Sequence, residues 1–264
     1  MTQIHSTALI DSKAKVGKNV NIGPFCCVGP GVVLGDGVQL VSHVTIAGNT
    51  QVGVETVVYP FASIGHPPQD LKYNGEENQL TIGKKNTIRE YVTLQPGTEG
   101  GGKVTKIGDH NLFMVAAHVA HDCHIGNHVV MANGATLGGH VIVEDHAIIG
   151  GLSAVHQFVR IGAHAIIGGM SGVERDVIPF GHVKGDRARL AGLNLIGLKR
   201  RGFESQAIQV LRDAYQDLFD DTAQPLTDRL ESVIARYGDN KDVMQLVAFI
   251  RCDSPRSLCL PQGE

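Results

Sequence analysis

The sequence predicts an all-β solenoid, a parallel β-helix of hexapeptide repeats, followed by a C-terminal α-helical domain. Three observations favour this fold class. Large apolar residues recur at every sixth position across residues 113–160. Glycine accounts for 33 of the 264 residues, while tryptophan is absent and aromatic residues make up 5%, which suits a narrow prism lined by small aliphatic side chains. Beyond residue 205 the apolar residues follow the i, i+3, i+4 spacing of amphipathic helices.

The six-residue repeat corresponds to one short strand and a turn. Three repeats make a coil of eighteen residues, and successive coils stack as parallel strands about 4.8 Å apart. Each repeat has a large apolar residue and, four positions later, a small or β-branched one, as in Phe113 and Ala117. Glycine and asparagine tolerate the left-handed backbone of sharp corners. The large positions of the central stretch are Phe113, Val119, Ile125, Met131, Leu137, Val143, Ile149 and Val155.

The repeats start at Ile4 and predict a first domain over residues 1–183, which amounts to about nine coils. Two stretches interrupt them. The first, near residues 65–81, is polar and contains Pro67 and Pro68, so it is expected to be an excursion loop. The second, near residues 96–106, is rich in glycine and flexible by composition. Long loops on a rigid scaffold often carry function.

The second predicted domain comprises residues 184–264. It begins with a basic connector over residues 184–201 and continues with helical spacing from Ala207 to Leu218, for which Ser205 is the expected N-cap. Two further helices are expected at residues 226–237, ended by Gly238, and at residues 241–251. The simplest role for these helices is to cover the open end of the β-helix and protect its strand edges.

Composition argues against several functional classes. The net charge of −3 gives no reason to expect nucleic acid or an anionic membrane as a partner. No apolar run approaches the roughly 18 residues of a transmembrane segment, and residues 1–12 lack the pattern of a secretory signal. The five cysteines show no paired spacing, and Cys26 and Cys123 fall at small inward positions. We therefore expect a cytoplasmic protein without disulfides.

The thirteen histidines include two columns with the period of a coil. His110, His128, His146 and His164 share one offset within their repeats, which predicts stacked side chains with a structural role. A second column belongs to the repeats that start at Val119, Leu137 and Val155. It carries His121, His140 and His156 at different offsets, with His118 immediately before it. Periodicity alone does not choose between the two columns.

Irregularity within a repeat often marks a site, and it favours the second column. Gly138 and Gly139 leave a backbone N–H open to the approach of a ligand, and Asp122 could polarise the imidazole of His121. Histidine, with an ordinary pKa of about 6.5, is suited to take a proton from a hydroxyl group at neutral pH. Buried histidines with a purely structural role remain the alternative.

Several segments of the sequence resemble one family closely. The sequence is similar to the UDP-N-acetylglucosamine 3-O-acyltransferases, which belong to the left-handed hexapeptide-repeat acyltransferases. The resemblance covers essentially the whole chain, and its most specific motifs are AHVAHDC and GLKRRGF. The matching segments are residues 69–73 (QDLKY), 111–114 (NLFM), 117–123 (AHVAHDC), 154–158 (AVHQF) and 197–203 (GLKRRGF).

The resemblance implies a left-handed coil, an exception to the usual crossover hand, and a homotrimer with active sites in clefts between subunits. It implies that the 3-hydroxyl of UDP-N-acetylglucosamine attacks a 3-hydroxyacyl thioester on acyl carrier protein, in the first step of lipid A synthesis. His121 would be the general base, Asp122 would orient it, and the N–H of Gly139 would stabilise the oxyanion. No acyl-enzyme, cofactor or metal is implied, so Cys123 would not be the nucleophile.

The resemblance also assigns binding residues. Gln69, Asp70 and Lys72 of the first loop would contact the sugar nucleotide, and Asn194 and Arg201 its uridine diphosphate. Arginine suits both a pyrophosphate and the acidic surface of the carrier, which Arg200 would dock. The alternative for this basic run is a solvated face. The residues that would line the same cleft are His118, His140, His156 and Gln157, and those at the position that limits acyl length are Gly169 and Met170.

Some questions stay open at this point. Gln95 and Pro96 stand where the family often has His-Arg, and Ile196 stands where a glutamate often follows Asn194. The acyl length is not determined, nor is acceptance of a 3-amino sugar, which would give an amide. Three rivals are the N-acyltransferase of the same pathway, which carries a substantial preceding domain, a zinc carbonic anhydrase on the same scaffold, and a non-catalytic scaffold subunit. The zinc ligands would be His118, His121 and His140.

Overall fold

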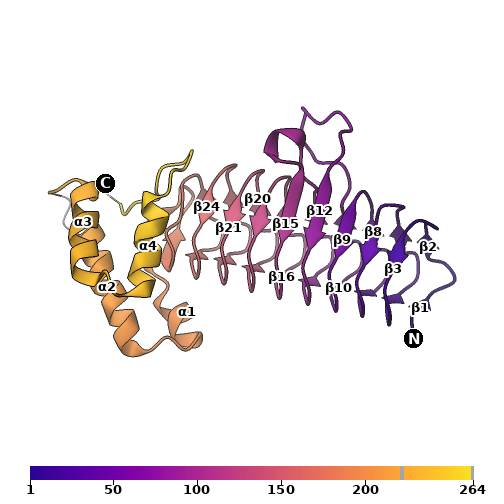
Figure 1. Cartoon of the computed structure of the whole chain (residues 1–264), viewed down its shortest axis with the longest axis horizontal. Coiled ribbons are helices and arrows are strands. Elements are labelled where there is room, and N and C mark those ends of the chain that lie inside the picture. Colours follow the sequence, from indigo (N-terminus) through magenta and orange to yellow (C-terminus); the bar gives the residue numbers. More distant parts are fainter. Residues whose placement is uncertain (221–222, 263–264) are drawn as a thin grey trace.

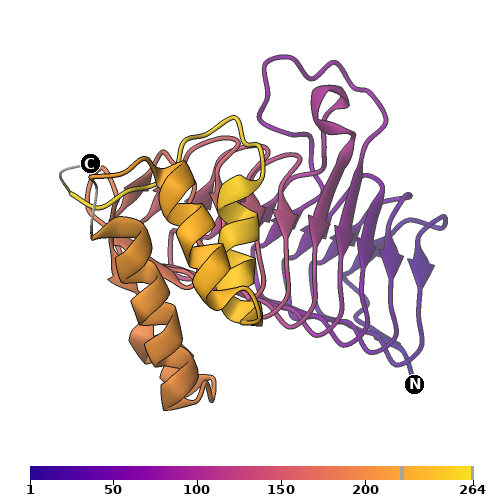
Figure 2. The ribbon, with the colours of Figure 1, turned by 60° about the vertical axis from the view of Figure 1, so that its left-hand side comes forward.

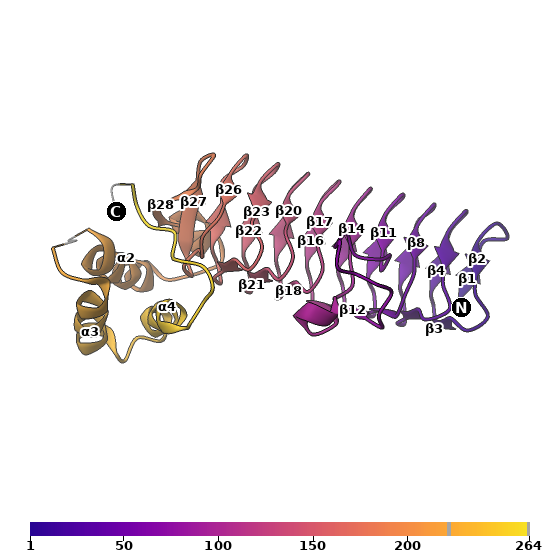
Figure 3. The same ribbon diagram turned by 90° about the horizontal axis from the view of Figure 1, so that it is seen from above.

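Three sheets form the faces of a long triangular prism, and α-helices pack at its C-terminal end (Figure 1). The described strand pairs are all parallel except that of β27 (Gly181–Lys184) with β28 (Arg189–Leu193) at the end of one sheet. The computed structural model describes residues 1–220 and 223–262. Within these residues sheet A has 11 strands, sheet B has 9 and sheet C has 8. From above, the strands follow one another in rows along the prism (Figure 3).

In sheet A the strands lie in the order β1 (Gln3–Ile4), β4 (Asn21–Ile22), β7 (Gln39–Leu40), β10 (Val57–Val58), β13 (Thr87–Ile88), β16 (Leu112–Phe113), β19 (Val130–Met131), β22 (Ile148–Ile149), β25 (Ile166–Ile167), β27 (Gly181–Lys184) and β28 (Arg189–Leu193). In sheet B they are β2 (Leu9–Ile10), β5 (Cys27–Val28), β8 (Thr45–Ile46), β11 (Ser63–Ile64), β14 (Thr93–Leu94), β17 (His118–Val119), β20 (Thr136–Leu137), β23 (Ala154–Val155) and β26 (Gly172–Val173). In sheet C they are β3 (Lys15–Val16), β6 (Val33–Leu34), β9 (Thr50–Val52), β12 (Gln79–Ile82), β15 (Val104–Ile107), β18 (His124–Ile125), β21 (Ile142–Val143) and β24 (Arg160–Ile161).

The register of the strands confirms the six-residue repeat. Val119 pairs with Leu137, which pairs with Val155, so each coil advances eighteen residues along the chain. In the two-residue strands of the central coils the second residue points into the prism, and the small residue four positions later fills the adjoining corner. Phe113 and Ala117 are both completely buried. Cys26 and Cys123, expected at small inward positions, are buried and free.

Many corners are occupied by residues other than glycine. His110, His128, His146 and His164 all have the left-handed backbone conformation, with φ between 56° and 63°. This conformation costs roughly 1–2 kcal/mol for an L-residue. The rings stack on one another with centroids 5.0, 4.8 and 4.7 Å apart, and Phe180 continues the stack beyond His164. The first histidine column is therefore a structural ladder on the corner between sheets C and A, as predicted.

Two loops leave the prism on one edge, between sheets B and C (Figure 2). The first runs from the end of β11 to the start of β12, over residues 65–78. The second runs from β14 to β15 and contains the short 3-10 helix η1 (Glu99–Gly101). The N–H of Glu99 donates to a carboxylate oxygen of Glu76 at 3.2 Å, so the loops contact each other.

The helices of the C-terminal part are α1 (Leu195–Arg200), α2 (Ser205–Phe219), α3 (Leu226–Tyr237) and α4 (Lys241–Arg251). The ranges predicted for α3 and α4 are confirmed. Ser205 is the first helical residue of α2, and Glu204 takes the N-cap position without a capping side-chain bond, so the predicted cap is wrong.

The segment expected to be a basic connector contains β28 and α1, which the sequence analysis missed. Asn194 caps α1, because its side-chain oxygen accepts the N–H of Gly197 at 3.0 Å. β27 crosses the predicted domain boundary at residue 183, and the division into two domains stays a prediction. Among the described residues, no helix combines the length and apolar character that crossing a bilayer would need.

Candidate active site

Three coils meet at the corner between sheets B and C with nine residues in register. Each coil contributes three of them, and each group follows a strand of sheet B. His140 is in register with Asp122 and Phe158 rather than with His121, and all three share the left-handed conformation. The nine are Ala120, His121 and Asp122, then Gly138, Gly139 and His140, then His156, Gln157 and Phe158. The uneven histidine offsets thus reflect three different rows of one corner.

His121 and Asp122 form a buried hydrogen-bonded pair. Nδ1 of His121 lies 2.7 Å from a carboxylate oxygen of Asp122, and the Asp122 side chain is completely buried. A carboxylate accepts hydrogen bonds, so Nδ1 carries the proton and Nε2 keeps its lone pair. The hydrogen bond therefore orients the ring of His121 and leaves Nε2 unprotonated.

The second loop encloses the Asp122 carboxylate. Thr98 donates its backbone N–H at 2.9 Å and its hydroxyl at 2.6 Å to the two oxygens. Burial raises the pKa of Asp122, but the hydrogen bonds from His121 and Thr98 outweigh this effect and hold the pKa below its usual value. A Cβ on Gly101 would stand 2.0 Å from the carboxylate carbon, so glycine in this loop permits close approach to Asp122.

Gly139 lies one coil beyond His121 and covers its ring. A Cβ on Gly139 would stand 2.5 Å from Cε1 and 2.6 Å from Nε2 of His121, and glycine alone fits there. Within the described part of the chain, the N–H of Gly139 has no hydrogen-bond partner. A backbone donor therefore lies close to the basic nitrogen of His121.

His140 and His118 flank the pair. The His140 ring meets that of His121 edge-on with centroids 5.0 Å apart and stacks on Phe158 at 4.4 Å. Nδ1 of His118 lies 2.6 Å from the Thr93 hydroxyl. Burial lowers the pKa of both His118 and His140, although Asp122 opposes the shift at His140. Both are therefore favoured as neutral rings.

A group of atoms that could hold a metal ion differs from the set expected of a zinc enzyme. Ligand atoms of His121, Asp122 and His140 lie within 4.8 Å of one another among the described residues. His118 is not part of this group, and Nδ1 of His121 is already engaged by Asp122. The trio of His118, His121 and His140 that the rival zinc enzyme would use does not form such a group among the described residues.

The first loop places two charged residues at this corner. Asp70 and Lys72 are close enough to His140 to affect its pKa in opposite directions, and the N–H of Lys72 donates to Asp70 at 3.0 Å. The N–H of Gln69 donates to the side-chain oxygen of Gln95 at 3.2 Å. Gln95, which departs from the family pattern, thus supports the base of this loop.

Cys123 follows the pair but is not available for chemistry. Its side chain is completely buried, and its thiol lies 3.2 Å from the carbonyl oxygen of Gly138. Burial raises the pKa of the thiol to about 12. A neutral, inaccessible thiol is a poor nucleophile.

Asn194, Arg200 and Arg201 lie elsewhere in the chain. They line a cavity of about 570 Å³ whose floor includes Ile148 and Ile166 of sheet A. Arg201 is half-buried and donates to the carbonyl oxygen of His146 at 2.6 Å, on the corner between sheets C and A. A single chain therefore does not bring these residues to the corner that holds His121. Ile196, the second departure, is exposed in the same cavity.

Gly169 and Met170 lie on the corner between sheets A and B. Both are exposed, and a Cβ on Gly169 would meet nothing closer than the carbonyl oxygen of Gly151 at 3.3 Å. His156 and Gln157 are exposed at the corner between sheets B and C, and Arg256 of the C-terminal segment contacts both. Arg256 and Thr98 were not predicted from the sequence, because only the fold brings these distant segments to the corner.

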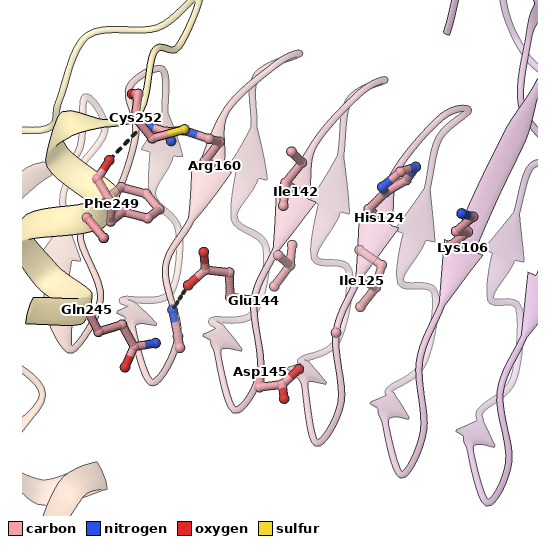
Figure 4. A pocket seen from close by; sticks show the side chains of 14 residues that line it. Lys106, His124, Ile125, Ile142, Glu144, Asp145, Arg160, Gln245, Phe249 and Cys252 are labelled. Atoms are coloured by element: carbon pink, nitrogen blue, oxygen red, sulfur yellow. Dashed lines mark hydrogen bonds between the residues drawn. The ribbon is translucent and has the colours of Figure 1, made fainter. Parts of the chain in front are cut away.

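A separate groove of about 740 Å³ lies between sheet C and α4 (Figure 4). Its floor includes Ile142, and Arg160 and Phe249 close it at the end beside α4. The Glu144 carboxylate in it accepts the N–H of Ala163 at 2.8 Å. None of the residues predicted to act in binding or catalysis lines this groove.

Known proteins match both the β-helix and the C-terminal part of this chain. A family model described as UDP-N-acetylglucosamine O-acyltransferase, domain 2, matches residues 176–259, and a hexapeptide transferase model matches residues 13–48 and 105–139. A relative from Caulobacter vibrioides, named acyl-[acyl-carrier-protein]--UDP-N-acetylglucosamine O-acyltransferase, is 51% identical over 99% of each chain. One from Rickettsia felis with the same name is 54% identical over 98% of this chain and 97% of its own.

The chain belongs to the UDP-N-acetylglucosamine O-acyltransferase family.

Solved structures of UDP-N-acetylglucosamine acyltransferases confirm the predicted fold class, a left-handed β-helix with C-terminal helices. A crystal structure of one such enzyme superposes with a TM-score of 0.94 at 43% identity, covering 99% of this chain and 100% of that one. The Francisella novicida enzyme gives 0.95 at 35% identity, covering 99% and 95%. Membership of this family confirms the prediction of an O-acyltransferase and argues against the carbonic anhydrase and the scaffold subunit.

Proposed function

We propose that this chain transfers a 3-hydroxyacyl group from acyl carrier protein to the 3-hydroxyl of UDP-N-acetylglucosamine, in the first step of lipid A synthesis in the cytoplasm. The names of the Caulobacter and Rickettsia relatives support the two substrates. The observation that carries the proposed chemistry is the His121–Asp122 pair, with the open N–H of Gly139 beside the basic nitrogen of His121.

In the proposed mechanism, Nε2 of His121 takes the proton of the sugar 3-hydroxyl as its oxygen attacks the thioester carbonyl carbon. The new C–O bond forms while the carbonyl electrons move to oxygen, and the N–H of Gly139 donates to that oxyanion. One such donor is worth on the order of 3 kcal/mol in other acyl-transfer enzymes. The intermediate then expels the carrier thiolate, which receives the proton from His121. Asp122 holds the imidazolium in place throughout.

Direct attack, without an acyl-enzyme, agrees with the burial and the high pKa of Cys123, the cysteine that directly follows Asp122. Cys123 is buried, and its high pKa keeps the thiol neutral. An acyl-enzyme mechanism would need a thiolate exposed to the thioester. The base and the oxyanion donor are instead arranged for a single displacement.

We further propose that the working site forms between subunits of a homotrimer. His121 lies on the corner between sheets B and C. Asn194 and Arg201 line a cavity on sheet A, and Arg201 also contacts the corner between sheets C and A. If both groups contact one sugar nucleotide, they must come from different copies. Asp70, Lys72, His118, His140, His156 and Gln157 would complete the cleft on the side of His121, and Arg200 would dock the carrier. Exposed apolar side chains along the corner between sheets A and B, among them Phe61, Tyr91 and Leu152, suit a protein contact.

The test uses purified trimer with 3-hydroxyacyl-carrier thioesters of mixed lengths, and with UDP-N-acetylglucosamine or its 3-amino analogue as acceptor. Mass spectrometry then reports the acyl length and whether an ester or an amide forms. His121→Ala should abolish transfer and leave the trimer intact. His110→Ala, a matched change in the histidine ladder on another corner, should retain activity. Transfer that survives His121→Ala would contradict the mechanism.

A further inference from the structure

His156 has a charged neighbour from a distant part of the chain. A terminal nitrogen of Arg256 lies 2.5 Å from Nδ1 of His156, and Nε of Arg256 donates to the carbonyl oxygen of Gln157 at 2.9 Å. The two contacts hold the guanidinium group of Arg256 against His156 and Gln157 at the corner between sheets B and C. They also constrain where the proton of His156 resides.

A guanidinium carries five N–H donors and no acceptor. Nδ1 of His156 must therefore accept the bond from Arg256, which leaves the ring proton on Nε2. A competing contact from Nδ1 to the carbonyl oxygen of Gln157 is longer, at 3.3 Å, and would need the proton on Nδ1. The short bond to a donor-only group decides between the two tautomers.

The segment that carries Arg256 is held firmly against the prism. Asp176 donates its N–H to Ser257 at 2.9 Å and accepts that of Cys259 at 2.7 Å, so the chain pairs with the end of the β-helix. The Asp176 carboxylate is completely buried and accepts two hydrogen bonds from Arg160, at 2.8 and 2.7 Å. Arg160 also packs over the ring of Phe249 in α4 (Figure 4). Arg256 thus projects from an anchored strand-like segment.

We propose that Arg256 is a positioning residue that holds His156 as the Nε2–H tautomer, so that His156 donates a hydrogen bond to a substrate oxygen. Asp122 fixes His121 in the opposite tautomer, with Nδ1 protonated and Nε2 bare. The two imidazoles stand on one corner about two coils apart, which is roughly 10 Å along the prism. One is prepared to accept a proton and the other to donate a hydrogen bond. Among the described residues Nε2 of His156 has no protein partner, which leaves this donor for a ligand.

The substrate oxygen belongs either to the sugar nucleotide or to the acyl donor, and this part of the inference rests on the proposed function. The tautomer itself does not, because it is a property of the free protein. A readout without substrate therefore separates failure of this inference from failure of the proposed function. The two KM values separate the two sources of the oxygen.

The experiment records ¹⁵N spectra of histidine-labelled protein, with the His156 signals assigned from His156→Gln. The variants are Arg256→Lys, which keeps a donor-only cation, and Arg256→Met, which keeps bulk without a donor. Arg251→Gln is the matched control, because this arginine pairs with Glu231 on the helices. We expect protonated Nε2 at His156 in the parent protein, Arg256→Lys and Arg251→Gln, and a shift toward protonated Nδ1 in Arg256→Met. His121 should keep protonated Nδ1 throughout, which verifies that the corner is folded.

In assays, Arg256→Met should raise the KM of one substrate about tenfold with a smaller effect on kcat, and Arg256→Lys should restore most of the loss. Protonated Nδ1 at His156 in the parent protein would overturn the inference. So would an unchanged tautomer in Arg256→Met, or a spectrum that shifts while both KM values stay the same.

Discussion

Gly139 lies eighteen residues after His121, one coil further along the prism, and a Cβ on Gly139 would stand 2.5 Å from Cε1 of the His121 ring. The coil period thus produces the site. It places a residue without a side chain over the ring of the proposed base, and the N–H of that residue is the oxyanion donor in the proposed mechanism. Neither residue could serve this role without the other.

Gly139→Ala should therefore displace the His121 ring and lower kcat. A shift of about 1 Å in a reacting group can cost on the order of 100-fold, and we expect a loss of that order with the trimer preserved. Gly151→Ala is the control, because a Cβ there meets nothing closer than 3.3 Å. Steady-state assays measure kcat for both variants. An unchanged kcat in Gly139→Ala would show that the His121 ring accommodates the added methyl group, which would contradict this account.

Thr98→Val removes the hydroxyl that donates to Asp122 and keeps the shape of the side chain. Loss of one hydrogen bond to a buried carboxylate should lower the free energy of unfolding by about 1–3 kcal/mol and reduce kcat/KM several-fold. The folded-state pKa of Asp122 is depressed, so its contribution to stability is present at neutral pH and lost as pH falls through that pKa. In Thr98→Val this loss should begin at a higher pH. Thr98→Ser should behave like the parent protein in urea unfolding at several pH values.

The histidine ladder should make stability depend on pH. Burial lowers the pKa of His164 to about 4, with His146 and Arg201 adding to the shift. Between about pH 6.5 and 4 the unfolded chain takes up a proton that the folded protein does not, so stability falls as pH falls through this window. His164→Phe keeps the stack with Phe180 and should flatten this part of the stability curve. If stability in His164→Phe still falls with pH as steeply as in the parent protein, another group causes the pH dependence. His110→Phe is the control for replacing a histidine ring of the ladder by phenylalanine.

Gly169→Met adds a long side chain at an exposed corner, where the new Cβ would lie 3.3 Å from the carbonyl oxygen of Gly151. If this corner limits the acyl chain, the variant should prefer shorter 3-hydroxyacyl donors. Each methylene group of the acyl chain that is no longer buried costs about 0.8 kcal/mol, which is close to fourfold in kcat/KM. Competition between donors of different length, read by mass spectrometry, measures the preference, with Gly151→Met as the control on the same corner. An unchanged distribution of products would place the limit on acyl length elsewhere.

The strands and the core could be predicted from the sequence because they obey a local rule. One large residue in six and one small residue four positions later fix the inward face, and the period of eighteen stacks Phe113 below Met131. The pairing of His121 with Asp122 was also accessible, because the two are adjacent in the chain. Even the stack of His110 on His128 follows from spacing alone.

The remaining parts depend on contacts between distant segments. Thr98 reaches Asp122 from a loop whose glycine content suggested only flexibility, and Arg256 reaches His156 across one hundred residues. No periodic signal marks either residue. α1 was missed because it is a six-residue helix fixed by its Asn194 cap and its packing, in a segment whose basic residues suggested a connector.

The central claim is that the base and the nucleotide contacts come from different subunits. In the proposed homotrimer, co-expression of His121→Ala and Arg201→Ala chains with different tags would yield trimers that carry both. Each mutant trimer alone should be inactive or strongly impaired. By cyclic symmetry every mixed trimer keeps one intact site, so it should recover about one third of the parent activity. Mixed trimers as inactive as their parents would contradict a site shared between subunits.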